Sequence, residues 1–347
     1  MERLFRIQRK LLPDLIMVVE KRYNILKEIQ HLQPIGRRIL AEKLDESERS
    51  VRNELDFLKD IGLIHITSAG AVLTDEGKEL LNELVDYIKV IKGISDLEAE
   101  VQKILGISQV LIVPGAYNPE YNKTELGRFA AGELKKILAN RKDELTILAV
   151  TGGTTMAEVA NTMTWDGENR QIIVIPGRGG LGEDVEIQAN TIAATIAKKL
   201  GGTYRMLHVP DNLQETTLNS LCQEPQIKEV LDLLARANIL VHGVGTAEEM
   251  AKRRGLSLSE INYLKEVGAV GEAFGFYFSE DGKIVYTTTS VGLKLDDLKR
   301  DDLLVIAIAE GEEKARAILS VVSPEYHDIL ITDEKTAREM LEIFHKR

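Results

Sequence analysis

Apolar residues recur at helical spacing three times within the first part of the chain. The three stretches are DLIMVVEKRYNILKEIQHL, PIGRRILAEKL and DESERSVRNELDFLKDIGLI. Spacings of three and four residues are typical of helices that bury one face. In the second stretch Ile39 is among the residues expected to face inward, and in the third Val51, Leu55 and Leu58 recur on one side. We therefore predict a small domain that begins with three helices.

A polar turn, Asp45-Glu46-Ser47, separates the second helix from the third and offers the third an N-cap. Two short helices joined by a tight turn form a helix-turn-helix, and the segment LIHITSAGAVLT that follows predicts a two-stranded hairpin. This order predicts a winged helix-turn-helix, whose second helix enters the major groove of DNA. A helical bundle with a solvated charged face is the alternative.

The outward face of the third helix has residue types that are suited to reading DNA. The positions near its start are Arg49, Ser50, Arg52 and Asn53. Arginine can pair with guanine, and asparagine with adenine, through two hydrogen bonds each. Residues 1–73 carry 13 Lys and Arg against 11 Asp and Glu, a net charge of +2, whereas the rest of the chain carries 31 against 44, a net charge of −13. We therefore expect double-stranded operator DNA to bind the first domain and not the second.

The next segment, DEGKELLNELVDYIKVIKGISDLEAEVQKILGI, predicts an amphipathic linker helix to about residue 105. Its apolar stripe consists of Leu80, Leu81, Leu84, Val85, Ile88 and Ile91. One use of so broad a stripe is to pair with a second chain, which a twofold-symmetric DNA site would favour. Packing on the chain's own wing is the alternative. We place the DNA-binding domain at residues 1–90 and the second domain at residues 106–347.

Beyond the linker, apolar runs alternate with helical stretches. The runs are QVLIVPG, LTILAVTGG, QIIVIPGRGG, TYRMLHVP, NILVHGVG and DLLVIAIA, and stretches such as ELGRFAAGELKKIL lie between them. Nearly continuous apolar strands separated by helices are typical of a parallel sheet covered on both faces. We predict an α/β domain with a doubly wound, mostly parallel sheet, which binds ligands at the carboxyl ends of its strands.

Several of these strands end in loops that contain glycine. In AVTGGTTMAEVA, Gly153 lets the backbone approach a ligand closely, and Thr154 and Thr155 begin a helix whose dipole favours an anion. A phosphate is the natural occupant, although the loop lacks both the Walker ending and the G-x-G-x-x-G pattern. A helix cap without a ligand is the alternative.

Other segments near strand ends supply side chains that suit a phosphorylated sugar. They are Arg178 in PGRGG, Gln188 and Asn190 in EIQANTIAATIA, Arg253 after HGVG, Glu272 in VGAVGEAFGFYF and Lys314 in EGEEKARAI. Cations pair with phosphates, and a carboxylate accepts hydrogen bonds from sugar hydroxyls. We expect Arg254, in contrast, to be a surface charge.

With these motifs and ERSVRNELDFLKDIGLI, the chain resembles the SorC/DeoR-type sugar-responsive transcriptional regulators over nearly its whole length. The resemblance implies an effector domain similar to glucosamine-6-phosphate deaminase and related isomerases, in a homodimer or homotetramer. It also implies a phosphorylated sugar as effector, with fructose-1,6-bisphosphate expected for a repressor of glycolytic genes. The effector-binding residues that we predict are Gly153, Thr154, Thr155, Arg178, Gln188, Arg253, Glu272 and Lys314. At the last of these the family pattern Gly-Gly-x-x-Lys is replaced by Glu310-Gly311-Glu312-Glu313-Lys314.

An isomerase or deaminase that acts on the same sugar phosphate is the alternative function. Such an enzyme needs a positioned general base, and the deaminases have Asp-Gly-His after the Gly-Val-Gly loop, where this chain has GVGTAEEM. His242 before that loop and His208 are the histidines in question. An isomerase has no use for a DNA-binding domain, so we expect a repressor without catalytic residues.

Three further features narrow the class of protein. Cys222 is the single cysteine, which excludes an internal disulfide and fits a reducing cytoplasm. No spacing of His, Asp and Glu matches a set of metal ligands, so we expect neither a metal nor a cofactor. No apolar run approaches the roughly 20 residues that span a bilayer, so we expect no membrane partner.

Overall fold

The computed structural model describes residues 11–115, 121–165, 171–179, 184–210 and 213–346, with the backbone alone at residues 82 and 86. The chain divides into two compact units. The first comprises residues 1–96 and 114–122, and the second comprises residues 97–113 and 123–347. Each unit has a hydrophobic core of its own.

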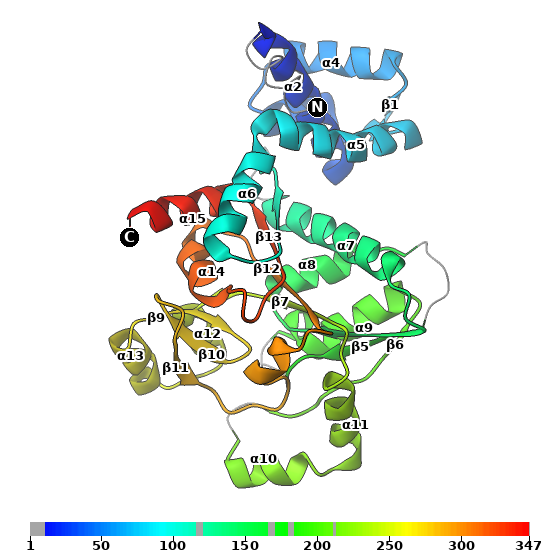
Figure 1. Ribbon diagram of the computed structural model, residues 1–347. Coiled ribbons are helices and arrows are strands. Elements are labelled where there is room, and N and C mark those ends of the chain that lie inside the picture. Colours follow the sequence, from blue (N-terminus) through cyan, green and yellow to red (C-terminus); the bar gives the residue numbers. More distant parts are fainter. Residues whose placement is uncertain (1–10, 116–120, 166–170, 180–183, 211–212, 347) are drawn as a thin grey trace. The chain divides into compact units, whose positions relative to one another are not determined.

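The first unit has the predicted order of helix, turn, helix and hairpin (Figure 1). Its elements are α2 (Pro13–Leu32), α3 (Arg37–Lys43), α4 (Glu48–Asp60), β1 (Ile64–Thr67), β2 (Gly70–Leu73) and α5 (Asp75–Lys92). The two strands pair antiparallel, with Ile64 opposite Leu73. The prediction of a winged helix-turn-helix is confirmed.

The core of this unit follows the predicted spacing in α4, and in and around α3 it does so except at Ile39. Val51, Leu55 and Leu58 are buried, as their recurrence predicts. Ile39 is 54% exposed, so the expectation that it faces inward is wrong. Its neighbours Leu40 and Ala41 occupy the buried face of this two-turn helix, and Ile39 is left on the opposite side.

The apolar stripe of α5 packs within its own unit. Leu81, Ile88 and Ile91 are buried in the same core as the residues of α2 and α4, and Leu80, Leu84 and Val85 pack against it half-buried. Helix α5 contacts α2 directly. Of the two uses predicted for the stripe, the structure therefore shows packing on the chain's own domain.

In the described residues, the second unit has a seven-stranded sheet in the order β3-β13-β12-β7-β4-β5-β6, and its paired strands are parallel. The strands are β3 (Gln109–Val113), β4 (Leu145–Val150), β5 (Gln171–Pro176), β6 (Thr203–Tyr204), β7 (Ile239–Gly243), β12 (Leu304–Ile308) and β13 (Ile329–Asp333). The predicted doubly wound, mostly parallel fold is confirmed. Strand β13 is absent from the runs in the prediction, although ILITD is wholly buried.

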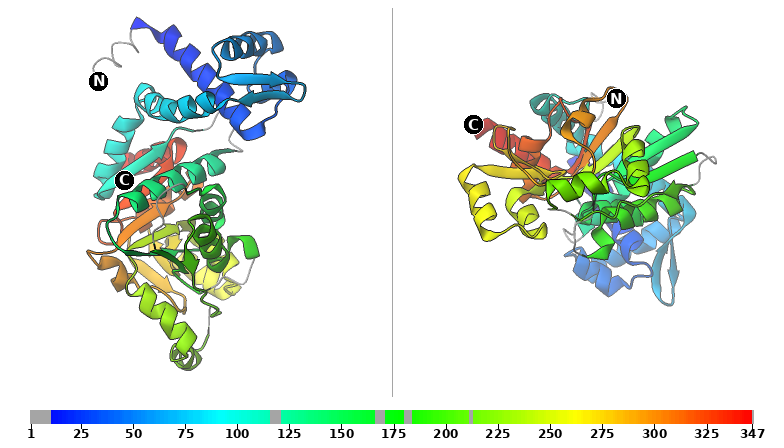
Figure 2. Two further views of the ribbon diagram at one scale, coloured as in Figure 1. Left: turned by 90° about the vertical axis from the view of Figure 1, so that its right-hand side faces the viewer. Right: turned by 90° about the horizontal axis from the view of Figure 1, so that it is seen from below.

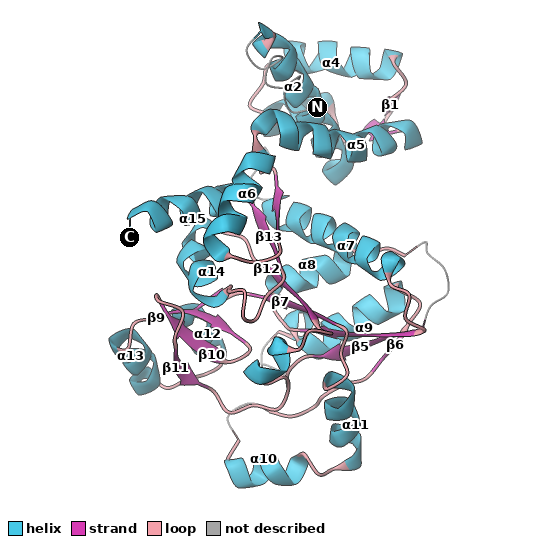
Figure 3. Ribbon diagram, in the orientation of Figure 1, coloured by secondary structure: helices cyan, strands magenta, loops and turns pink. Residues whose placement is uncertain are grey.

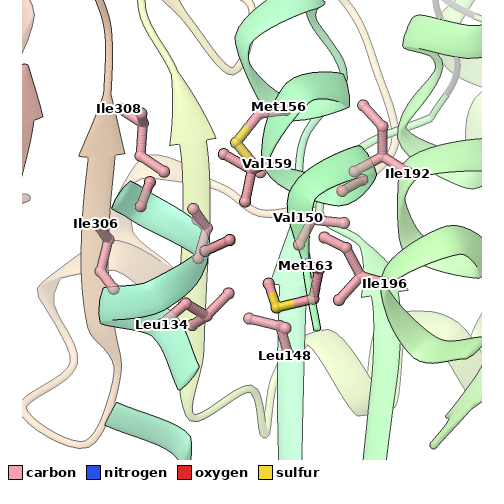
Figure 4. Packing of buried hydrophobic residues seen from close by; sticks show 14 of the residues in the cluster. Leu134, Leu148, Val150, Met156, Val159, Met163, Ile192, Ile196, Ile306 and Ile308 are labelled. Atoms are coloured by element: carbon pink, nitrogen blue, oxygen red, sulfur yellow. The ribbon is translucent and has the colours of Figure 1, made fainter. Parts of the chain in front are cut away.

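Helices precede, connect and follow these strands. They are α6 (Ile94–Leu105), α7 (Asn122–Asn140), α8 (Thr154–Thr162), α9 (Ala189–Lys199), α10 (Glu215–Leu221), α11 (Pro225–Leu234), α12 (Ala247–Arg253), α13 (Leu258–Glu266), α14 (Ala315–Val321) and α15 (Glu334–Lys346). Leu134 of α7, Val159 of α8 and Ile196 of α9 meet Leu148 and Val150 of β4 (Figure 4). These three helices therefore cover one face of the sheet, as the views in Figure 2 also show.

A second, antiparallel sheet lies apart from the parallel one (Figure 3). Its described strands, in the order β11-β10-β9-β8, are β8 (Gly245–Thr246), β9 (Ala269–Ala273), β10 (Phe276–Ser279) and β11 (Ile284–Thr287). Helices α12 and α13 contact β9 and pack around Tyr277 in a small core of their own. This sheet was not predicted, and it carries Glu272 in β9.

Candidate functional site

Helix α4 presents the predicted DNA-reading residues near its start. Ser47 occupies the N-cap, and its hydroxyl accepts a hydrogen bond from the Ser50 amide at 3.1 Å, which confirms the cap expected in the polar turn. Arg49, Arg52 and Asn53 are exposed. The side chain of Arg52 lies 3.7 Å from Asp56, one turn along the helix, at 66% exposure. Such an exposed pair is weak, so the guanidinium can exchange this carboxylate for another partner.

Ser50 differs from its neighbours because it belongs to a hydrogen-bonded network. Lys21 on α2 donates to the Ser50 hydroxyl at 2.7 Å and pairs with Glu46 in the turn at 2.7 Å. Hydrogen bonds from Lys21 and Ser50 lower the pKa of Glu46, with that from Lys21 the stronger cause. The network fixes the start of α4 to α2 and to the turn. Ser50 is therefore half-buried, and the other three predicted DNA-reading residues are exposed.

The strand order of the parallel sheet creates a place for a ligand in the second unit. From β4 the chain continues outward through β5 and β6, whereas β7, β12 and β13 extend the sheet in the opposite direction. Neighbouring β4 and β7 are thus the point where the direction reverses, and the loops at their carboxyl ends diverge there. Doubly wound sheets bind ligands in this crevice.

A pocket opens at this point, and the space within it, including the part open to solvent, is about 770 Å³. The residues that line it are Thr151, Gly152, Gly153, Thr154, Thr155, Met156, Arg178, Gly179, Ala189, Gly243, Val244, Gly245, Glu249, Met250, Arg253, Arg254, Glu272, Phe274 and Lys314. The structure therefore brings together seven of the eight residues predicted to bind an effector.

The glycine loop after β4 leads into the start of α8. A Cβ on Gly152 would lie 2.7 Å from the carbonyl oxygen of Ile187, so only glycine fits beside that segment. Gly153 has φ +128°, and its amide donates to the same carbonyl at 2.8 Å. As the N-cap of α8 it has no side chain to accept hydrogen bonds from the first turn. The amides at Thr154 and Thr155 therefore remain for an anion in the pocket.

Arg178 reaches the pocket from the loop after β5. Its Nη2 donates to the Thr288 hydroxyl at 2.9 Å, and its Nη1 lies 3.9 Å from Oε1 of Glu272. A Cβ on Gly275 would lie 2.0 Å from Nη1, so the guanidinium passes directly over a glycine. The side chain is 7% exposed, and its orientation is thus fixed by packing as well as by hydrogen bonds.

The adjacent arginines at the end of α12 have different environments. Arg253 is 26% exposed, and its Nη2 lies 3.3 Å from Glu249 one turn earlier. Arg254 is 4% exposed, and its Nη2 donates to Oε1 of Glu272 at 2.7 Å. The expectation that Arg254 is a surface charge is wrong, because its side chain reaches a buried carboxylate 18 residues further along the chain.

Lys314 lines the pocket from the turn before α14. The amide of Gly311 donates to the Thr336 hydroxyl at 2.8 Å and to Asp333 at 3.2 Å, which anchors this turn to the start of α15. Burial raises the pKa of Glu310, while Lys123 at 3.8 Å opposes the rise. Lys314 lines the pocket even though Glu310 stands where the family pattern has its first glycine.

Gln188 and Asn190 lie beside the pocket and not among its lining residues. Gln188 is half-buried at the N-cap of α9, next to Ala189, which does line the pocket. The Asn190 amide donates to the Leu207 carbonyl at 3.1 Å, and its Oδ1 accepts from the Leu207 amide at 2.9 Å. Asn190 therefore fastens α9 to the segment after β6 and does not face a ligand.

Phe274 is a pocket residue that the sequence analysis missed. It has φ 56° and Gly275 has φ 85°, so they form a two-residue turn between β9 and β10. Two central residues with positive φ match the twist of a tight hairpin, and Gly is common there, but Phe is not. A signal was present, because AFG lies between two runs of strand-forming residues.

Two buried histidines lie behind this ring. His242 on β7 has its ring 4.3 Å from that of Phe274 and 5.0 Å from that of His327. Burial lowers the pKa of His242 to about 4, and burial followed by the charge of His242 lowers the pKa of His327. Nδ1 of His242 lies 2.9 Å from the Gly243 carbonyl, which can only accept, so Nδ1 carries the proton of the neutral ring.

The described residues show little that would suit an isomerase, a metal site or a membrane-spanning segment. Among the described residues that line the pocket there is no histidine, and His208 is exposed elsewhere. The part of the chain that the structure describes holds no group of three or more His, Cys, Asp or Glu side chains able to bind a metal ion. None of its described helices has the length and hydropathy needed to cross a bilayer.

The chain combines a winged helix-turn-helix with a pocket at the point where the strand order of the parallel sheet reverses. This combination defines a DNA-binding regulator with a ligand-binding domain. Family models agree, since the CggR N-terminal DNA binding domain matches residues 18–88 and the sugar-binding domain model Sugar-bind matches residues 89–342. The chain belongs to this family of sugar-binding transcriptional regulators, whose members are not enzymes.

Named relatives extend over the whole chain. It is 43% identical to the central glycolytic genes regulator of Priestia megaterium, over 99% of this chain and 100% of the relative. It is also 43% identical to the regulator of that name from Bacillus subtilis, over 98% and 99%. The crystal structure of a SorC family transcriptional regulator from Enterococcus faecalis is 42% identical, with a TM-score of 0.64 over 71% of this chain and 99% of that one.

Proposed function

We propose that this chain represses glycolytic genes, and that fructose-1,6-bisphosphate bound in the pocket changes its affinity for operator DNA. The name shared by the relatives that are 43% identical supports the class of genes. The observation that carries the effector is the start of α8, which has no capping side chain and opens into a pocket lined by arginine and lysine.

Each part of a sugar bisphosphate has matching groups in the pocket. One phosphate binds the first-turn amides of α8 and the hydroxyls of Thr154 and Thr155. Arg178, Arg253 and Lys314 supply positive charge for the phosphates. The contacts that the structure gives Glu272 all engage Oε1, so Oε2 accepts a hydrogen bond from a sugar hydroxyl. Gln188 is a further predicted contact, from the start of α9.

DNA binding belongs to residues 1–90, in which Arg49, Arg52 and Asn53 read base edges and Ser50 supports them. A homodimer or homotetramer places one such helix on each operator half-site, because a twofold site requires a symmetric protein. The effector changes operator affinity only as far as it binds the DNA-bound and free states unequally.

The test uses the full chain and the duplex that it selects from random-sequence DNA. Fluorescence anisotropy measures operator affinity at fixed salt with fructose-1,6-bisphosphate, with fructose-6-phosphate and with inorganic phosphate. We expect the bisphosphate to shift operator affinity or subunit assembly at the lowest concentration of the three. If none of the sugar phosphates changes either quantity, the proposed effector is wrong. Rapid turnover of a hexose phosphate would favour the enzyme instead.

A further inference from the structure

One short segment of the chain leaves the second unit and returns to it. Residues 114–122, the connecting segment, belong to the first unit, whereas residues 97–113 and 123–347 on either side belong to the second. The connecting segment starts after β3, at the carboxyl edge of the parallel sheet where the pocket opens, and it ends as α7 begins. It therefore joins the ligand-binding sheet to the DNA-binding unit covalently, in addition to the junction at residues 96 and 97.

Tyr121, near the end of the connecting segment, contacts two helices of the DNA-binding unit. Its ring is stacked on that of His31 in the last turn of α2, with the ring centres 4.6 Å apart and the planes inclined by 8°. Nζ of Lys43, the last residue of α3, lies 6.0 Å from the centre of the same ring. Stacked rings and a cation over a ring each contribute about 1 kcal/mol. Tyr121 is thus bound to the ends of α2 and α3, directly before the turn that leads into α4.

The first turns of α7, which follow Tyr121 in the chain, pack against α8. A Cβ on Gly127 of α7 would lie 2.8 Å from the backbone carbonyl carbon and from the Cβ of Glu158, so the two helices meet here without room for a side chain. The Thr124 hydroxyl donates to the Glu158 carboxylate at 3.4 Å. Glu158 lies one turn after Thr154, so the start of α7 contacts the helix whose first turn lines the pocket.

A second contact joins the start of α7 to the turn that carries Lys314. Nζ of Lys123 lies 3.8 Å from Oε1 of Glu310, whose side chain is 14% exposed. Burial raises the pKa of Glu310, and the charges of Lys123 and Lys314 both oppose that rise. The carboxylate therefore interacts with a lysine of α7 and with a lysine of the pocket. A phosphate bound to Lys314 neutralises the second of these charges and so changes the attraction between Glu310 and Lys123.

We propose that Tyr121 is a positioning residue through which effector binding changes operator affinity. An effector phosphate held by the start of α8 and by Lys314 acts on the first turns of α7 at two points. Tyr121 directly precedes α7, and its ring carries the change to the ends of α2 and α3 and so to the turn before α4. This inference rests on the proposed function, because it requires an effector in the pocket and a duplex on α4.

The first test measures the coupling, which is the factor by which saturating fructose-1,6-bisphosphate changes operator affinity of the full chain in fluorescence anisotropy. Couplings between distant sites are typically about 5- to 150-fold. We expect Tyr121→Leu and His31→Gln each to reduce this factor at least about threefold, and Tyr121→Phe, which keeps the stacked ring, to retain it. The matched control is Tyr326→Leu, which removes another half-buried tyrosine with a lysine over its ring and should retain the coupling.

Two further measurements separate coupling from a structural role. Isothermal titration calorimetry gives the affinity of each variant for the bisphosphate without DNA, and circular dichroism monitors its fold. A variant that is folded and binds the effector but has lost the coupling supports the proposal. If the original chain responds to the effector and Tyr121→Leu responds equally, the proposal is overturned, and so it is if Tyr326→Leu loses as much. Should Tyr121→Leu fail to fold, His31→Gln decides by the same criteria.

A double-mutant cycle tests the same connection without any effector. Glu310→Gln alters the pair with Lys123, and its effect on operator affinity is measured in the original chain and in the Tyr121→Leu or His31→Gln chain. Independent changes at distant sites are additive within about twofold, so we expect a departure from additivity of at least about threefold. Glu133→Gln, which breaks a different glutamate–lysine pair on α7, is the control and should be additive.

The cycle also separates failure of the connection from failure of the effector. Additive effects of Glu310→Gln and Tyr121→Leu overturn the proposal, whatever the effector does. If no sugar phosphate changes operator affinity of the original chain while the cycle departs from additivity, the proposed effector is wrong and the connection through Tyr121 stands.

Discussion

The two units use arginine in opposite ways. On α4 of the first unit, Arg49 and Arg52 are exposed, and the nearest partner of Arg52 is a solvated carboxylate on the same helix. In the pocket of the second unit, Arg178 and Arg254 are buried and engage partners from other elements. A side chain in water is free to read a duplex, whereas a buried one is held in place for a small anion. Exposure can be inferred from a helical pattern, but a buried partnership cannot.

The largest effect should come from Arg178→Gln. It removes a buried cation from the pocket, so we expect fructose-1,6-bisphosphate to bind about 100-fold more weakly, a loss of about 3 kcal/mol. Operator binding without effector should not change. Calorimetry and anisotropy check the two quantities. The control is Arg205→Gln, an exposed arginine that pairs with Glu229 at 2.7 Å in the same domain. Equal losses in both variants would mean that burial does not distinguish these arginines.

The buried histidine predicts an acid-sensitive second unit. Because burial lowers the pKa of His242 to about 4 from 6.5, the unfolded chain binds more protons between these values, and stability falls as pH falls through this range. At pH 5 the loss expected from His242 alone is about 2 kcal/mol relative to pH 7. His327, whose pKa is also lowered by burial, adds a loss in the same direction. Unfolding in urea at several pH values measures the slope, and His242→Asn should reduce it. His65→Gln, on an exposed wing residue of the first unit, is the control, and a slope unchanged by His242→Asn would contradict the assignment.

The exposed asparagine on α4 should matter for DNA alone. We expect Asn53→Ala to weaken binding to the selected operator about tenfold, to relax base preference at one position and to leave effector binding unchanged. Anisotropy with the operator and with a shuffled duplex separates specific from general binding. The matched change is Lys59→Ala, at an exposed position near the other end of α4. An equal loss on both duplexes after Asn53→Ala would assign Asn53 to the phosphate backbone.

The smallest effect should come from Lys21→Met. It breaks the hydrogen bond to Ser50 and the ion pair with Glu46. In this ion pair the side chain of Lys21 is 27% exposed and that of Glu46 is 34% exposed. Pairs exposed to this extent contribute up to about 1 kcal/mol, so we expect a loss of about 0.5 kcal/mol in unfolding free energy. Urea unfolding of the Lys21→Met and Lys78→Met variants gives the comparison, because Lys78 forms a more exposed pair with Asp75. A loss of several kcal/mol would show that the network supports the whole domain.

Local rules explain what could be predicted of this fold. Val51, Leu55 and Leu58 repeat on one side of a helix, and the polar turn before it supplies the cap at Ser47. Long apolar runs separated by helices indicate the parallel sheet. The antiparallel sheet was missed because β8 has only two residues and the runs of β9 and β10 are interrupted by the turn at Phe274 and Gly275.

Short-range periodicity and glycines at strand ends were enough to predict two domains, the winged helix-turn-helix and the doubly wound sheet, and seven residues that line the pocket were also predicted. The folded chain alone reveals that Arg254 is buried against Glu272, that Asn190 is hydrogen-bonded to Leu207 and that the stripe of α5 packs on its own domain. The physical reason is that a charged or polar side chain becomes buried when a partner from another element meets it, and no local pattern records that meeting.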